Sequence, residues 1–370
     1  MNKDKPRESM LSIVKGWVNR YFSQEEVVLL VLILTLALVV LATLGAVLAP
    51  VFTALVIAFL MQGMVQKLKS WHVPHWLAVT LSCVVLVGTI VALLFVVLPI
   101  IWRQLVRLGA ELPNMVQRGQ ELLLLLPERY PRLISAGQID EIFNTLGSEL
   151  GGLGQTLLAF SLTNLPIFAG LLIYVVVVPI LVFFFLKDAE QLIRWCTSFL
   201  PKERPMLHQI WHEMNDQVAN YVRGKVIEIG IVAAVSYAAF LLLGVNYALL
   251  LAVAVGFSVL IPYIGAAVVT IPVAAIGLFQ WGWSNEFFYL MMTYGIIQLL
   301  DGNVLVPLLF SEAVNLHPVA IILAVLFFGG IWGFWGVFFA IPLATLLKAI
   351  MSAWPTHEHQ VEWEARRSSE

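Results

Sequence analysis

The feature that most constrains this sequence is a long stretch without cationic side chains. Residues 226–347 contain no Lys and no Arg. Apolar segments long enough to cross a bilayer recur there and along most of the chain. These segments are continuous and do not alternate with polar residues, which excludes a transmembrane β-barrel. Only 12% of the residues are charged and 60% are hydrophobic. We therefore predict an all-α polytopic membrane protein with about eight transmembrane helices, including short, broken or re-entrant segments.

Charged residues divide the chain into regions. Lys67 and Lys69 flank the first hairpin together with the basic N-terminal segment, so the positive-inside rule predicts a cytoplasmic N-terminus. Ala49-Pro50 is expected to end the first span. The predicted regions are a cytoplasmic amphipathic leader at 1–26, the first three membrane segments at 27–102, an external helical insert at 103–165, a fourth span at 166–186, cytoplasmic amphipathic helices at 187–225, a C-terminal membrane core with broken helices at 226–348 and a cytoplasmic tail at 349–370.

Interruptions in the C-terminal apolar region are the first pointer to function. Broken membrane helices often line transporter binding sites, because unwound backbone is tolerated only where it is buried in protein or faces water. Interruptions occur at Ile261–Gly265, Asp301–Pro307 and Gly329–Gly336. Each also has a structural explanation: prolines kink helices, and closely spaced glycines allow helices to pack. The apolar run before Pro262 is too short to span comfortably, so we predict that Pro262, Tyr263 and Gly265 shape a gate.

Asp301 is the most unusual residue of this region. Only four acids, Glu228, Glu286, Asp301 and Glu312, occur between residues 226 and 347. A carboxylate in hydrocarbon costs roughly 2.5 kcal/mol or more, so Asp301 is expected at a surface, at a wet cavity or in neutralised form. Asp301, Gly302 and Asn303 are candidates for a substrate or ion pathway, with Glu312 as a further candidate. Capping of a helix end by Asp301 and Asn303 is the structural alternative.

Other classes of protein find little support. His212-Glu213 lacks the second histidine of a zinc-protease helix, and no phosphate-binding loop is present. Asp301 is alone, whereas an intramembrane aspartyl protease needs two carboxylates. Cys83 and Cys196 do not have metal-ligand spacing. We therefore expect no enzyme activity, no metal and no cofactor. The formal net charge of −2 gives no bulk attraction to nucleic acid.

Several segments resemble the autoinducer-2 exporter family, and within it the PerM-type permeases. These segments are Tyr221-Val222-Arg223-Gly224-Lys225, the run from Gly256 through Pro262-Tyr263-Ile264-Gly265, and Gln298-Leu299-Leu300-Asp301-Gly302-Asn303 with the residues that follow through Ile341-Pro342. The resemblance implies a multi-pass protein of the bacterial inner membrane that moves a small solute or ion. It also implies a homo-oligomer, with a pentamer as the candidate form. Cytoplasmic N- and C-termini agree with the charge pattern. Tyr221, Arg223, Gly224 and Lys225 are predicted to form a cytoplasmic motif, and a cytoplasmic collar of the fifth span is the structural explanation for Arg223 and Lys225.

Three functional hypotheses remain open at this point. The leading one is secondary transport of a small polar solute by a protein embedded in membrane lipid. The second is sodium/proton antiport, with Asp301 or Glu312 exchanging the proton. The third is a non-transporting oligomeric scaffold or regulator that docks through the insert at 103–165 and the amphipathic stripe at 207–221.

Overall fold

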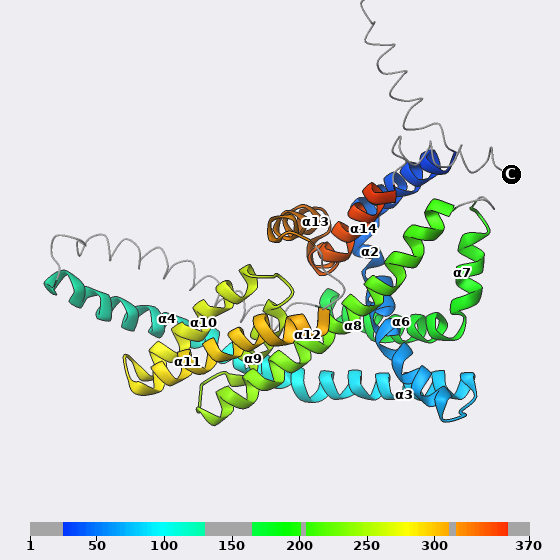
Figure 1. Ribbon diagram of the computed structural model, residues 1–370. Coiled ribbons are helices and arrows are strands. Elements are labelled where there is room, and N and C mark those ends of the chain that lie inside the picture. The colour runs from blue at the N-terminus through cyan, green and yellow to red at the C-terminus, as the bar shows by residue number, and fades with distance from the viewer. Residues whose placement is uncertain (1–24, 130–164, 201–204, 311–315, 354–370) are drawn as a thin grey trace, which may run out of the picture. The chain divides into compact units, whose positions relative to one another are not determined.

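The structure is a computed structural model that describes residues 25–129, 165–200, 205–310 and 316–353 (Figure 1). All regular elements within these ranges are helical, as apolar segments in a bilayer require for their backbone groups. They are α2 (Glu25–Ser70), α3 (His75–Ala92), η1 (Leu93–Val97), α4 (Leu98–Arg129), α6 (Leu165–Lys187), α7 (Ala189–Thr197), α8 (Pro205–Leu242), α9 (Ala248–Ser258), α10 (Ile264–Trp281), α11 (Asn285–Leu300), η2 (Asp301–Leu305), α12 (Val306–Phe310), α13 (Pro318–Phe338) and α14 (Ala340–Ala353).

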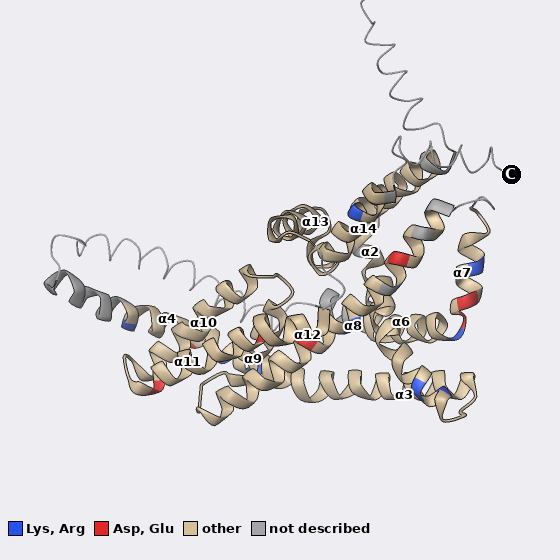
Figure 2. Ribbon diagram, viewed as in Figure 1, with Lys and Arg blue, Asp and Glu red and all other residues tan. Residues whose placement is uncertain are grey.

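The helices have the lengths and composition of membrane spans. Among the described residues, 7 helical segments are long and apolar enough to cross a bilayer, or up to 8 if the bent pair formed by α6 and α7 counts as one span. Two shorter apolar segments, Ala248–Ser258 and Ala340–Ser352, accompany them. Figure 2 shows how few charged residues lie on α9, α10 and α11. The prediction of an all-α, multi-pass membrane protein with short and bent segments is confirmed.

The chain forms two compact units, and the boundary between them falls inside α2 and α8. The first unit comprises Met1–Phe52, Asp188–Tyr221 and Glu312–Glu370. Its described apolar core joins α2, α8 and α14 through Leu30, Ile210, Met214, Ala349 and Ile350.

The second unit comprises Thr53–Lys187 and Val222–Ser311 and contains two apolar cores. One joins α2, α3 and α6 through residues such as Ala58, Val79 and Val182. The other joins α8 to α11 around Phe240 and Leu290. This second core holds the polar groups described below.

One predicted helix boundary is wrong. Pro50 lies inside the continuous helix α2 and does not end it, although candidate spans are recognised on both sides of Ala46. A proline is tolerated inside a long apolar helix where neighbouring groups and local adjustment of the backbone satisfy the polar groups that it frees. Helix α4 runs through Trp102 to Arg129, so the region predicted as an external helical insert begins as a continuation of this helix, and its external location stays a prediction. Residues 130–164 of that region lie outside the described residues.

The three interruptions predicted from sequence take different forms. Non-helical residues separate α9 from α10 between Ser258 and Ile264. The segment from Asp301 is a π-helical turn within a continuous helix, so it is not a helix end. Gly333 has φ +59° and ψ −134° inside α13, a conformation that favours glycine, and it bends the chain sharply there.

Each π-helical turn is followed by a proline. In η1 the N–H of Leu98 donates to the Leu93 carbonyl, and Pro99 follows. In η2 the N–H of Val306 donates to the Asp301 carbonyl, and Pro307 follows. A proline inside a helix lacks the N–H for its own bond, and its ring collides with the carbonyl four residues earlier. A turn widened by one residue moves that carbonyl away, which explains why both π turns precede a proline.

Candidate functional site

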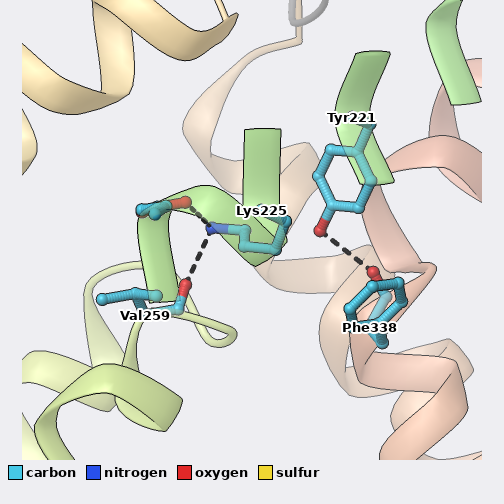
Figure 3. A network of polar contacts seen from close by, with 5 residues as sticks. Tyr221, Lys225, Val259 and Phe338 are labelled. Carbon is cyan, nitrogen blue, oxygen red and sulfur yellow. Dashed lines mark hydrogen bonds and ion pairs between the residues drawn. The ribbon is translucent and has the colours of Figure 1, made fainter. Parts of the chain in front are cut away.

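Lys225 is the centre of a group of polar contacts in the second unit. Its side chain is only 5% exposed, and its Nζ lies 2.7 Å from Oε2 of Glu228, whose side chain is 2% exposed. The same ammonium donates a hydrogen bond of 2.9 Å to the Val259 carbonyl (Figure 3). It also lies over the ring of Phe310, 5.3 Å from its centroid. Residues of α8, the end of α9 and α12 thus converge on one buried cation.

The contact with Val259 has a structural reason. Helix α9 has 11 residues and is therefore about 16 Å long, roughly half the hydrocarbon thickness of a bilayer. Its last carbonyls have no helical partner at that depth, and each needs one because no water is available in lipid. Lys225 supplies a partner for the carbonyl of Val259, which caps the helix.

The turn after α9 is tight. Tyr263 has φ +65° and ψ −49°, which is uncommon for a residue with a side chain and marks local strain. A Cβ atom at Gly265 would overlap the Ser258 carbonyl oxygen, so only glycine allows the chain to cross itself here. On the far side of the turn, the Tyr294 hydroxyl donates to the Ala266 carbonyl at 3.1 Å. Lys225 and Tyr294 therefore hold opposite sides of the α9–α10 hairpin.

Asp301 continues the buried face of α11. Leu290, Tyr294 and Ile297 are buried at the spacing of one helix face, and Asp301 follows four residues after Ile297. Asp301 is within electrostatic range of both Lys225 and Glu228. Its Oδ1 is buried without a hydrogen-bond partner among the described residues, as is Nε2 of Gln298, one turn earlier. We call Lys225, Glu228, Gln298 and Asp301 the polar cluster.

Unsatisfied buried polar atoms are uncommon in native proteins and often mark a site that is completed by another molecule. Asp301 supplies an acceptor and Gln298 a donor, so together they can bind a group that both donates and accepts hydrogen bonds. The π turn beneath Asp301 agrees with a functional position, because such turns are frequent at functional sites.

The Tyr221–Lys225 motif packs inside the protein. Tyr221, Gly224 and Lys225 are buried and Arg223 is half-buried, while the cytoplasmic location of the motif stays a prediction. In the first unit, the Tyr221 hydroxyl donates to the Phe338 carbonyl at 2.9 Å (Figure 3). In the second unit, Nε of Arg223 donates to the Phe59 carbonyl at 3.2 Å. The polar groups of the motif thus bind carbonyls on other helices, which a sequence alone cannot distinguish from a charged surface.

The other predicted site residues differ in how far they are exposed. Pro262 is half-buried and Tyr263 exposed, and both lie in the turn of the α9–α10 hairpin with the buried Gly265. Gly302 and Asn303 are exposed, whereas Asp301 is half-buried.

The capping interpretation fails for both members of the proposed pair. The Asn303 amide donates to the Leu299 carbonyl of its own helix and does not accept from a free N–H. The turn that begins at Asp301 has no side-chain cap. Glu312 lies outside the described residues.

Sequence reasoning missed two members of the polar cluster. Glu228 was recognised as an isolated acid but not as the partner of Lys225, although three-residue spacing places both on one helix face. Gln298 is uncharged and was therefore not considered, although its position three residues before Asp301 places both on one helix face. Among the described residues, no group of three or more His, Cys, Asp or Glu could hold a metal ion. What the cluster offers is hydrogen bonding and charge.

Comparison with known proteins places these features in context. The family model described as "AI-2E family transporter" matches residues 27–356. The Escherichia coli K12 protein named "Putative permease PerM" is 47% identical over 346 residues, which cover 94% of this chain and 98% of that protein. "Putative transport protein YueF" of Bacillus subtilis is 25% identical over 305 residues, covering 81% and 82% of the two chains. "AI-2 transport protein TqsA" of Escherichia coli K12 is 25% identical over 302 residues, covering 82% and 84%.

Proposed function

This chain belongs to the AI-2E transporter family, and from that premise we propose that it is a secondary transporter of a small polar solute. The solute passes the polar cluster in the inner membrane, and both termini lie in the cytoplasm. The observation that carries the proposal is the Lys225 ammonium, which binds both a buried carboxylate and the carbonyl at the broken end of α9.

The solute binds where the polar cluster has unused capacity. Oδ1 of Asp301 accepts a hydrogen bond and Nε2 of Gln298 donates one, so a hydroxylated solute satisfies both atoms. The relative TqsA is named for transport of AI-2, which makes AI-2 the first solute to test. Specificity then follows from the cost of leaving either buried atom unpaired when an apolar molecule enters.

Movement of the solute is coupled to the α9–α10 hairpin. Asp301 attracts the Lys225 ammonium, and a solute that changes the hydrogen bonding of Asp301 changes that attraction. When Lys225 shifts toward Asp301, the Val259 carbonyl loses its donor and the end of α9 becomes free to move. Tyr294 retains its bond to the Ala266 carbonyl, so α10 remains attached to α11 while α9 opens.

Flux measurements in proteoliposomes test this proposal. Vesicles are loaded with AI-2, and efflux is followed for the native chain, Asp301→Asn and Asp301→Ala. Glu286→Gln is the matched control, because Glu286 is an exposed acid at the start of the same helical span. We expect both Asp301 variants to lose about tenfold or more in rate, equivalent to about 1.4 kcal/mol in the barrier, while the control retains flux. Unchanged flux in folded Asp301 variants would refute the role of Asp301.

Sodium/proton antiport is a second candidate, and one observation favours it. Lys225 pairs with Glu228, which leaves the Asp301 carboxylate without an ion-pair partner among the described residues. A proton or a monovalent cation would balance that charge. Proteoliposomes with an internal pH dye report this activity: a sodium gradient moves protons through the native chain and not through Asp301→Asn. AI-2 efflux without sodium-dependent proton movement would select solute transport. Absence of both activities from the native chain would favour a scaffold.

Oligomeric assembly is a further part of the proposal. The family resemblance supports a homo-oligomer, with a pentamer as the candidate form. Mass determination of the reconstituted protein in lipid nanodiscs tests it, and a monomeric mass would contradict it.

A further inference from the structure

Helix α7 has an apolar face that packs on nothing described. None of its residues is buried. Leu192 is 37% exposed, Ile193 46% and Trp195 63%, and Phe199 just beyond the helix is 71% exposed. Such side chains are usually covered by protein or lipid when they gather on one face of a helix.

The apolar and polar residues of α7 are fully separated. At 100° per residue, Leu192, Ile193, Trp195 and Cys196 occupy an arc of about 160°, with Cys196 near its middle. Glu190, Gln191, Arg194 and Thr197 occupy the opposite side. Arg194 and Glu190 form an ion pair of 3.4 Å between side chains that are 72% and 89% exposed, which marks this side as the one that faces water.

The position of α7 in the chain identifies what covers its apolar face. The spanning helix α6 ends at Lys187, and a single non-helical residue, Asp188 with φ −111° and ψ 20°, separates it from α7. A helix that starts one residue after a span starts at the membrane surface. Trp195, whose ring meets that of Phe199 edge-to-face at 5.3 Å, is of the residue type that anchors helices at this depth.

We propose that α7 is an interfacial helix, with Leu192, Ile193, Trp195 and Cys196 inserted at the boundary of headgroups and acyl chains. The ligand is the lipid surface itself. With Glu190 and Arg194 of opposite sign, insertion depends on apolar contact and not on anionic headgroups. Figure 2 shows both charge signs on α7.

Site-directed spin labelling tests the proposal, because the chain contains only two cysteines. In Cys83→Ser, a nitroxide on Cys196 probes the apolar face. In Cys83→Ser/Cys196→Ser/Gln191→Cys, the label lies on the polar face as the matched control. The proteins are reconstituted in phosphatidylethanolamine/phosphatidylglycerol vesicles, and relaxation by oxygen and by a water-soluble nickel complex is compared.

The expected result is strong relaxation of the Cys196 label by oxygen and weak relaxation by nickel, with the reverse at position 191. Equal nickel access at both positions would place α7 in water and overturn the proposal. A Cys196 label shielded from both reagents would mean that protein covers the face, which also overturns it.

A second measurement avoids the cysteine substitutions. Brominated lipids quench tryptophan fluorescence on contact, so the quenched fraction should fall in Trp195→Phe relative to the native chain. No change in that fraction would contradict insertion of Trp195.

Discussion

At the scale of single residues, Lys225 connects the local structure of this protein to its proposed function. An ammonium buried to this degree is costly unless it is paired and hydrogen-bonded, and Glu228, Val259 and Phe310 meet those needs. Asp301 lies within electrostatic range of the same cation. Lys225 is paired with Glu228 and has a second carboxylate, that of Asp301, within electrostatic range. This arrangement suits the exchange of partners that we propose for transport.

The Lys225–Glu228 pair predicts a characteristic double-mutant result. Lys225→Met leaves Glu228 buried without a counterion and should lower the free energy of unfolding by about 3–5 kcal/mol. The double variant Lys225→Met/Glu228→Gln removes the uncompensated charge and should recover much of that loss. Unfolding titrations with SDS measure both. Equal stability of the single and double variants would show that the pair is not coupled.

Gly224 offers a second prediction at this scale. A Cβ atom there would lie 2.8 Å from Cε1 of Phe310, the ring over which Lys225 lies. Gly224→Ala should therefore displace the ring and lower stability by about 1–3 kcal/mol.

Gly230→Ala is the control for this change, because nothing lies within 4 Å of a Cβ atom at that position on the same helix. It should be neutral or stabilising by up to about 1 kcal/mol. Thermal unfolding in detergent compares the two variants. Equal transition temperatures for Gly224→Ala and Gly230→Ala would argue against close packing of Phe310 on α8.

At the scale of elements, the two π turns have the same backbone geometry but different side chains. Both precede a proline, and both relieve the same steric conflict. Only η2 carries ionisable and amide side chains, whereas η1 consists of Leu, Val and Phe. The proline accounts for the geometry, and the residues inside the turn determine whether that geometry has a functional use.

Substitution of the two prolines should separate these effects. Pro307→Ala restores an N–H and permits regular α-helix, which should raise the thermal transition but slow flux because Asp301 rotates away from Lys225. Pro99→Ala should raise the transition in the same way without affecting flux. Unfolding scans and proteoliposome efflux are measured on the same preparations. A Pro307→Ala protein with native flux would contradict the functional role of η2.

At the scale of the whole molecule, placement of both termini in the cytoplasm stays a prediction, and it requires an even number of spans. The described helices allow 7 spans, or 8 when the bent pair is counted. An even number returns the chain to the side on which it began, which agrees with cytoplasmic placement of both termini from the positive-inside rule. If α7 lies at the interface, α6 must form the eighth span without α7.

Reporter fusions test this parity. A C-terminal green fluorescent protein should be fluorescent and a C-terminal alkaline phosphatase inactive, since phosphatase folds only outside the cytoplasm. Phosphatase fused after Leu126 should be active if the region following α4 is external. Activity of the C-terminal phosphatase fusion would indicate an odd number of spans.

The sequence by itself determined the helical class, the membrane environment, the family and the positions of the three interruptions in the C-terminal region. These follow from apolar run length, from the scarcity of charge and from Gly and Pro, all of which act locally along the chain. It did not distinguish an interruption that ends a helix from one that widens it, as at Asp301, because that depends on how a single turn accommodates Pro307. Only the tertiary structure paired Lys225 with Glu228 and Val259, and only it showed that the Asn303 amide donates to the Leu299 carbonyl. The three-residue spacing of Lys225 and Glu228 permits their ion pair, but the burial of that pair and the capped Val259 carbonyl depend on helices distant in sequence, which no local pattern encodes.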